Sequence, residues 1–294
     1  MDFLRPQSWA DALAAKAEHP AAVPIAGGTD LMVELNFDHR RPDALLDLNP
    51  VRELAGWDVD GDHIRIGAGL PYSRLIAELG DRLPGLAMAS RTVGSPQIRN
   101  RGTVGGNLGT ASPAGDTHPA LLACTAQVEA ASVRGTRLIP IEDFYLGVKR
   151  NALAGDELIA AVHLPSADGP QQFAKVGTRN AMVIAVCAFA LRLSPGRESV
   201  GAALGSSAPT PRSTTAAVDF LTGELAAHNL WHSRNPLPEN MISRFGELVA
   251  GAAAPIDDVR GSAAYRRHAL AVLARRTLGW AWQEYRRDGE AACA

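Results

Sequence analysis

The chain has 294 residues, of which 46% are hydrophobic and 20% are charged, as in an ordinary globular protein with one or two domains. The formal net charge of -2 and the lack of a basic stripe with interleaved aromatics argue against a nucleic-acid or anionic-membrane binder. No apolar run approaches the about 18 residues that cross a bilayer, so we expect no membrane span.

The three cysteines, Cys124, Cys187 and Cys293, lie far apart in the sequence. They form no CxxC motif and no pair with a histidine. The sequence therefore predicts neither a disulfide framework nor a metal or iron–sulfur site made by this chain alone. This cysteine usage fits a reducing compartment, and the first residues do not resemble a secretory signal. We expect a cytoplasmic protein.

The N-terminal part contains a short glycine turn between a strand and a helix. An apolar run over 23–26 predicts the strand, and the sequence GGTD at 27–30 leads into a predicted helix over 31–36. Such a turn can direct free backbone N–H groups at a phosphate. The alternative is a tight turn without a ligand, because paired glycines are common in turns.

Further elements follow from hydrophobic periodicity and breaker residues. Strands are predicted over 44–48, 63–66, 127–133, 137–141, 156–164, 173–177, 184–193 and 200–204. Helices are predicted over 73–79, 84–93, 119–125, 214–221, 239–250 and 262–287.

Composition places one lobe boundary near 49–61 and a polar linker over 166–172. The sequence thus predicts a first domain over 1–170, with lobes 1–55 and 56–170, and a second domain over 171–294.

The last predicted helix is rich in arginine. We interpret these arginines as a solvated or subunit-facing surface rather than as a nucleic-acid site: Arg266, Arg267, Arg275, Arg276, Arg286 and Arg287.

The segment 99–116 (RNRGTVGGNLGTASPAGD) is unusually poor in bulky side chains. Its glycines allow close approach of the backbone to an anion, and no lysine follows Arg101. We interpret it as a glycine-rich loop. Together with the turn at 27–30, it predicts two loops that grip one extended phosphate ligand.

Neither glycine segment is a Walker or a Rossmann motif. The predicted phosphate contacts are therefore neutral, from backbone amides and the hydroxyls of Thr29 and Thr103, which suits a permanently held cofactor. Asn107 and Asp116 are candidates for orienting that cofactor through its ribityl or ribose hydroxyls. Asp116 could equally cap the following helix.

The sequence shows no nucleophile–base pair and no histidines at metal-ligand spacing among its eight histidines. We interpret His118, close to the glycine segment, as an incidental residue. We therefore predict no catalytic residue and no metal ligand in this chain, and expect the bound cofactor to carry the chemistry.

Several motifs together resemble a known family. PIAGGTDL at 24–31, TVGGN at 103–107 and TASPAGD at 110–116 are similar to the FAD-binding medium subunit of molybdenum hydroxylases. That family includes the flavoprotein subunits of carbon monoxide dehydrogenase and xanthine dehydrogenase. The resemblance continues through DELIAAVHLP at 156–165, FAKVGTR at 173–179 and the segment 255–276.

The resemblance implies an α+β fold like that of vanillyl-alcohol-oxidase-type flavoproteins. Two subdomains would hold FAD, and a C-terminal domain would combine a small antiparallel sheet with helices. It also implies cofactor contacts, which include two residues near the flavin ring, Ile159 and Lys175. The full set is Ala26, Gly27, Gly28, Thr29, Asp30, Leu31, Thr103, Val104, Gly105, Gly106, Asn107, Asp116, Ile159 and Lys175.

Lys175 would stabilise anionic reduced flavin if its cation lay near the pyrimidine end of the ring. The alternative is a strand lysine that points to water. The chain departs from the family at Val183, where many members have an acid, and at Val93, where some have an aromatic residue. It also lacks the cysteine-bearing insertion with which some relatives hold an extra iron–sulfur cluster.

The resemblance implies an electron-transfer subunit of a heterotrimer. An iron–sulfur small subunit would supply electrons from a molybdopterin large subunit, and FAD in this chain would pass them to a terminal acceptor. One alternative is a self-sufficient FAD-dependent oxidase or dehydrogenase acting on a small molecule. A second is an assembly protein that kept the fold and lost the cofactor.

Overall fold

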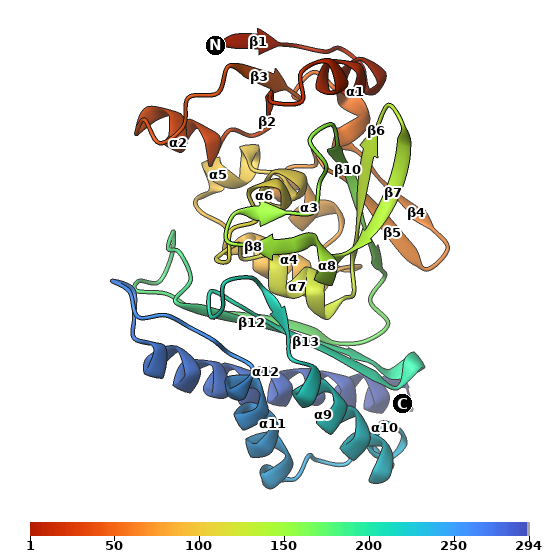
Figure 1. The fold of residues 1–294 in the computed structure, drawn as a ribbon. Coiled ribbons are helices and arrows are strands. Elements are labelled where there is room, and N and C mark those ends of the chain that lie inside the picture. Colours follow the sequence, from red (N-terminus) through yellow and green to blue (C-terminus); the bar gives the residue numbers. More distant parts are fainter. Residues whose placement is uncertain (293–294) are drawn as a thin grey trace. The chain divides into compact units, whose positions relative to one another are not determined.

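The structure of the protein is a computed structural model that describes residues 1–292 (Figure 1). The chain forms two compact units. Unit 1 consists of Met1–Glu78, Val93–Ser112 and Ala126–Pro165. Unit 2 consists of Leu79–Thr92, Pro113–Thr125 and the residues from Ser166 onward. Cys124 and Cys187 are buried free thiols, and Cys293 lies outside the described residues.

Unit 1 begins with a small parallel sheet in the order β1-β3-β2. Its strands are β1 (Asp2–Leu4), β2 (Val23–Ile25) and β3 (Ala44–Asp47). Helix α1 (Trp9–Glu18) follows β1, and helix α2 (Leu31–Asn36) follows β2. The side chain of Ser8 accepts from the Asp11 N–H and so caps α1. The predicted strand over 44–48 and the helix over 31–36 are confirmed within a residue.

A second, antiparallel sheet of unit 1 has the order β4-β5-β10-β6-β7. Its strands are β4 (Trp57–Asp60), β5 (His63–Gly67), β6 (Gln127–Ser132), β7 (Gly135–Pro140) and β10 (Leu158–Pro165). The central strand, β10, is buried along most of its length, which explains its nearly continuous apolar sequence.

Shorter elements connect these strands. They are η1 (Arg52–Ala55), α3 (Tyr72–Glu78), α8 (Ile141–Phe144), β8 (Tyr145–Gly147) and β9 (Arg150–Asn151). The β8–β9 hairpin was not predicted from the sequence, because its strands are very short and one contains a glycine.

The glycine-rich segment is not the loop that we expected. It forms two short helices, α5 (Pro96–Arg101) and α6 (Val104–Thr110). The side chain of Ser95 caps α5, and that of Thr103 caps α6 by accepting from the Gly106 N–H. Val104 and Leu108 of α6 are fully buried. Capping and burial together outweigh the low helix propensity of glycine.

Unit 2 is built on an antiparallel sheet in the order β11-β12-β13-β14. The strands are β11 (Gln171–Val176), β12 (Cys187–Ser194), β13 (Ser199–Gly205) and β14 (Arg212–Ser213). The helices are α4 (Pro84–Arg91), α7 (His118–Ala123), α9 (Thr215–Ala227), α10 (Leu230–Ser233), α11 (Glu239–Gly251) and α12 (Ala263–Ala292), with the short turn η2 (Pro195–Arg197). This small sheet with helices confirms the α+β class.

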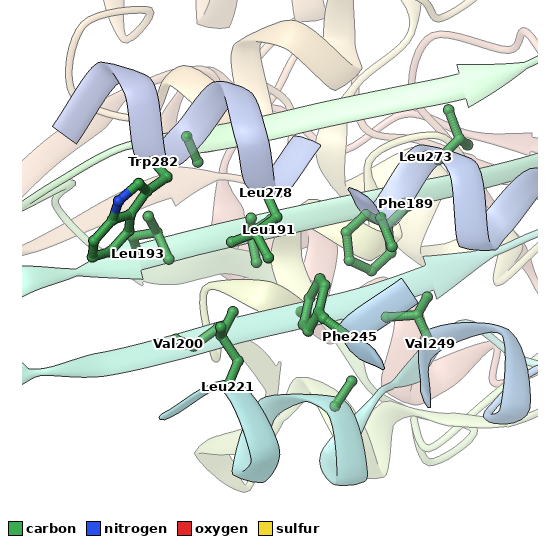
Figure 2. Packing of buried hydrophobic residues seen from close by; sticks show 14 of the residues in the cluster. Phe189, Leu191, Leu193, Val200, Leu221, Phe245, Val249, Leu273, Leu278 and Trp282 are labelled. Atoms are coloured by element: carbon green, nitrogen blue, oxygen red, sulfur yellow. The ribbon is translucent and has the colours of Figure 1, made fainter. Parts of the chain in front are cut away.

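The main core of unit 2 lies between the sheet and helices α9, α11 and α12 (Figure 2). Alternate residues of β12, including Phe189, Leu191 and Leu193, point into it. Phe189 and Phe245 meet edge to face, with ring centroids 6.2 Å apart. The chain thus needs long, amphipathic helices at its C-terminal end to cover this face of the sheet.

One arginine of α12 does not match its predicted role. Arg266 is only 3% exposed, so it is not part of a solvated or subunit-facing surface. Its guanidinium donates to the Ser206 carbonyl oxygen at 2.6 Å and to Asp258 Oδ1 at 2.5 Å. The structural reason is that α12 packs against the loop that carries Asp258, and a buried guanidinium needs a carboxylate partner.

We expect Asp258→Asn to lower the melting temperature (Tm) of the protein at pH 7. The backbone N–H of Arg260, and then the side chains of Arg260 and Arg266, hold the pKa of Asp258 well below its ordinary value. The stabilisation is therefore complete well above the ordinary aspartate pKa of about 4 and is lost progressively as the pH falls from there toward the depressed pKa.

Scanning calorimetry at pH 7, 5 and 2 tests this. The Tm difference between the two proteins should be equal at pH 7 and 5 and smaller at pH 2. Glu247→Gln, which removes a surface pair with Arg244, is the control and should leave Tm nearly unchanged. An unchanged Tm of Asp258→Asn at pH 7 would contradict the assignment.

Within residues 1–292, no helix combines the length and the apolar character needed to cross a membrane.

Candidate cofactor site

Unit 1 contains a cavity of about 380 Å³. Its walls come from the segment between β2 and α2, the turn at 68–69 after β5, helix α6, the end of β9 and the start of β10. Both glycine segments that the sequence singled out contribute to it. Of the predicted cofactor residues, those that line this cavity are Ala26, Asp30, Leu31, Gly105, Gly106 and Ile159.

The loop between β2 and α2 has unused backbone donors. The N–H groups of residues 27–31 donate no hydrogen bond to any other residue that the structure describes. Gly28 has a φ of +74°, a conformation that favours glycine. The loop is half-buried, and buried N–H groups are normally paired. It therefore offers donors to water or to a ligand.

Gly27 is required by the chain's own packing. A Cβ at this position would lie 2.0 Å from the carbonyl oxygen of Arg101. Asn49 supports the same contact, because its side-chain amide donates to the Ala26 carbonyl and its Oδ1 accepts from Arg101. The two glycine segments thus touch through their backbones, at the junction of the β2–α2 loop and α5.

The first turn of α6 differs from our expectation that both segments supply free amides. The Gly105 N–H donates to the Ala68 carbonyl at 3.0 Å, and the Gly106 N–H donates to Thr103 Oγ1 at 2.9 Å. A Cβ at Gly105 would lie 2.4 Å from the Ala68 Cβ. Position 105 therefore requires glycine, because α6 packs closely on Ala68.

The side of helix α6 that lines the cavity carries no large side chain. Gly106, Gly109 and Thr110 lie on one side of the helix and line the cavity, whereas Val104 and Leu108 face the interior. Apart from its chain neighbours and the backbone of its own helix, a Cβ at Gly109 would meet no atom nearer than Ile159 Cδ1, at 3.9 Å. A ligand can therefore approach the helix backbone. We did not predict Gly109 and Thr110 as site residues, because we treated this segment as a loop. They follow Gly106 by three and four residues, a spacing that places all three on one side of a helix.

A β-bulge in β10 helps to place Ile159. The pairing of β10 with β6 shifts register between Ile159 and Ala161. The intervening Ala160 carbonyl accepts from the Ala68 N–H at 2.9 Å, and Ala68 in turn accepts from Gly105. The bulge, the turn at 68–69 and α6 are thus hydrogen-bonded in series along the cavity wall.

Charged side chains of both signs surround the cavity. Lys149 Nζ and Glu34 Oε1 form an ion pair at 2.6 Å, which links the β8–β9 hairpin to α2. The hydrogen bond from Lys149 holds the pKa of Glu34 below its ordinary value. Burial raises the pKa of Asp30, and a hydrogen bond from Thr110 opposes that shift. We did not predict Lys149 as a site residue, because its partner Glu34 lies far away in the sequence.

Two predicted cofactor residues, Asp116 and Lys175, lie in unit 2 and form an ion pair. Lys175 Nζ is 2.6 Å from Asp116 Oδ2, and the side chains are 11% and 9% exposed. The alternative that Lys175 is a strand lysine pointing to water is therefore wrong. Asp116 Oδ1 is buried and has no hydrogen-bond partner among the described residues.

The remaining predicted residues have structural surroundings of their own. Thr103 and Val104 are buried, and Asn107 is half-buried on α6. His118 is fully buried at the start of α7, and burial lowers its pKa to about 3, so the imidazole is neutral at physiological pH.

Comparison with known proteins defines the class. Residues 1–167 match the family described as "FAD binding domain in molybdopterin dehydrogenase". Residues 172–281 match the family described as "CO dehydrogenase flavoprotein C-terminal domain". The chain belongs to the family of FAD-binding medium subunits of molybdenum hydroxylases.

Individual relatives agree over nearly the whole chain. The xanthine dehydrogenase FAD-binding subunit of Escherichia coli O157:H7 is 31% identical over 94% of each chain. The nicotine 6-hydroxylase medium subunit of Paenarthrobacter nicotinovorans is 33% identical over 86% of this chain and 87% of its own. A solved chain of reconstituted CO dehydrogenase from Oligotropha carboxidovorans has a TM-score of 0.86 and 28% identity, and covers 97% of this chain and 98% of its own.

Proposed function

We propose that this chain works in a heterotrimer with an iron–sulfur small subunit and a molybdopterin large subunit, and passes electrons to a terminal acceptor. Its relatives carry names such as xanthine dehydrogenase FAD-binding subunit and nicotine 6-hydroxylase medium subunit, which supports partner subunits. A cytoplasmic location belongs to the same proposal, because the sparse cysteines suit a reducing compartment.

We propose that the cavity of unit 1 holds the phosphate part of FAD. The observation that carries this proposal is the set of unused N–H groups over 27–31, because Asp30 and Leu31 of this set line the cavity and such groups can donate to the anionic pyrophosphate. The side of α6 that lines the cavity supports it, because Gly106 and Gly109 let a ligand touch the helix backbone. These residues fit the cofactor that the family binds.

Each side of this site has a separate role in the proposal. The loop Ala26–Leu31 donates hydrogen bonds, whereas Thr103, Val104, Gly105 and Asn107 shape α6 and anchor it on Ala68. Ile159 offers an apolar surface to the flavin ring. Asp116 and Lys175, which lie in unit 2 and pair with each other, stay predicted cofactor contacts. Because the sequence predicts no catalytic residue, the chain's contribution is to bind and orient the cofactor.

When bound, FAD supplies reversible two-electron, two-proton redox chemistry. The substrate would lose two electrons at the large subunit, and the small subunit would deliver the same two electrons to this chain. The acceptor then removes them, so that electrons balance over one turnover.

Co-expression of this chain with the genes for its small and large partners tests the assignment. An affinity tag on this chain should recover a complex that contains iron, sulfide, molybdenum and FAD. In that complex, dithionite should reduce the flavin, and removal of the small subunit should stop substrate-driven flavin bleaching. Bleaching of the flavin by a small substrate in the isolated chain would instead favour a self-sufficient oxidase.

A further inference from the structure

One ion pair joins two segments of the cavity wall in unit 1. Glu34 lies on α2, Lys149 lies at the tip of the β8–β9 hairpin, and both residues line the cavity. Lys149 Nζ is 2.6 Å from Glu34 Oε1, and the two side chains are 57% and 23% exposed. Because both residues border the cavity and also reach solvent, the pair lies at the rim of the cavity.

The tip of the hairpin has few other contacts with the wall. The Lys149 backbone N–H donates to the Ala111 carbonyl at 3.2 Å, and the Asn151 side-chain amide donates to the Gly109 carbonyl at 2.9 Å. Lys149 also has a φ of +54°, a left-handed conformation that costs free energy in a residue other than glycine. The tip is thus a segment that can open locally without unfolding the rest of unit 1.

The base of the hairpin is anchored more firmly than its tip. Phe144 and Tyr145 are buried, and the Ala152 N–H donates to the Phe144 carbonyl at 3.0 Å. At the tip, by contrast, the side chains of Leu146 and Val148 are mostly exposed and bury little apolar surface. The tip can therefore move about a fixed base.

A second link across the same rim is weaker than the ion pair. Thr110 Oγ1 lies 3.4 Å from Asp30 Oδ2, but it also lies 3.0 Å from the Gly106 carbonyl oxygen. A hydroxyl has one proton, so the two acceptors share it and the bond to Asp30 is weak. The pair of Lys149 and Glu34 is therefore the stronger of the two links between α2 and the segments that face it.

We infer that the β8–β9 hairpin, residues 145–151, is a strap across the rim of the cavity, and that the ion pair of Lys149 and Glu34 is the latch that holds the strap closed. The inference rests on the proposed function, because it takes FAD as the ligand that enters and leaves the cavity. The strap must separate from α2 before FAD can pass. Lys149 controls this passage through Glu34 and not as a contact of the ligand.

A latch has a kinetic signature that a direct ligand contact lacks. Because the pair closes the empty and the loaded chain alike, the fraction of open chains multiplies the rate constants of association and dissociation by the same factor. The dissociation constant (Kd), which is their ratio, does not depend on the latch. A direct contact of Lys149 with the ligand would instead slow dissociation and lower Kd.

Stopped-flow measurement of FAD binding to the FAD-free full-length chain tests the inference, with release followed by flavin fluorescence after dilution. Lys149→Met should raise both rate constants by about three- to fivefold, as expected for the loss of a partly exposed ion pair. Kd should change by less than about 1.5-fold, because both rate constants rise together. Glu34→Gln should have the same effect, and the double variant should be no faster than either single variant.

Arg134→Met is the matched control. Arg134 Nη2 pairs with Asp156 Oδ1 at 2.7 Å, and their side chains are 64% and 25% exposed, much like those of the latch. Neither residue lines the cavity, so this variant should leave both rate constants unchanged. Unchanged rate constants in Lys149→Met would overturn the inference. So would a higher Kd with an unchanged association rate, because that result indicates a direct contact.

A covalent link in place of the ion pair provides the opposite test. In a chain with Glu34→Cys, Lys149→Cys and Cys293→Ser, a short thiol cross-linker should hold the strap closed, because Cys124 and Cys187 are buried. FAD uptake and release should then nearly stop, and normal rates in the cross-linked chain would overturn the inference. Failure of the unmodified chain to bind FAD would refute the proposed function, whereas normal exchange in a cross-linked chain that binds FAD would refute the strap alone.

Discussion

Gly109→Leu should weaken FAD binding by at least about 100-fold, or ~2.7 kcal/mol, without destabilising the protein. Gly109 lines the cavity, and a Cβ there meets only Ile159 Cδ1 at 3.9 Å. The new side chain therefore enters the space that we assign to the cofactor. Leucine also has a higher helix propensity than glycine, by about 0.8 kcal/mol, so Tm should not fall.

Titration of the FAD-free protein with FAD, and thermal unfolding without FAD, measure the two quantities separately. Gly56→Leu is the matched control, because a Cβ at Gly56 of unit 1 meets nothing within 4 Å and the residue lies outside the cavity wall. It should bind FAD like the unmodified chain. Normal affinity in Gly109→Leu would show that the cofactor lies elsewhere.

Gly27→Ala should destabilise the folded chain by about 3 kcal/mol or more, which is large for a single methyl group. The Cβ would lie 2.0 Å from the Arg101 carbonyl oxygen, and backbone cannot give way as a flexible side chain can. The β2–α2 loop must move away from α5, and its row of N–H groups moves with it. FAD retention should therefore be lost together with stability.

Gly28→Ala provides the comparison for this prediction. Gly28 has a positive φ of +74°, but a Cβ there would meet only side chains, the nearest at 3.3 Å. The expected cost is that of the left-handed conformation, about 1–2 kcal/mol. Urea unfolding of both variants measures the difference, and a smaller loss in Gly27→Ala than in Gly28→Ala would contradict the close backbone contact.

Local signals in the sequence predicted much of the fold. The GGTD turn and the following helix over 31–36, and strands β11, β12 and β13 of unit 2, depend on short-range patterns. The two-residue strand β14 was not predicted. The family followed from motifs spread over the chain, and the comparisons confirm it.

The site depends on contacts that no local pattern contains. Gly105 looked like a ligand-facing loop residue, yet it packs on Ala68 of another segment. Lys149 and Glu34 pair across 115 residues of sequence, and Lys175 and Asp116 across 59. The glycine-rich sequence of α6 did not predict a helix. The helix is stabilised by the Thr103 cap and the burial of Leu108 rather than by the helix propensity of its residues.

The visible spectrum of the purified chain shows whether this chain itself holds FAD. We expect the absorption bands of oxidised flavin, and FAD released by denaturation in a one-to-one ratio to protein. FAD should also restore the spectrum of a chain that has been stripped of it. A colourless chain that cannot be reconstituted with FAD would show that this chain does not hold the cofactor.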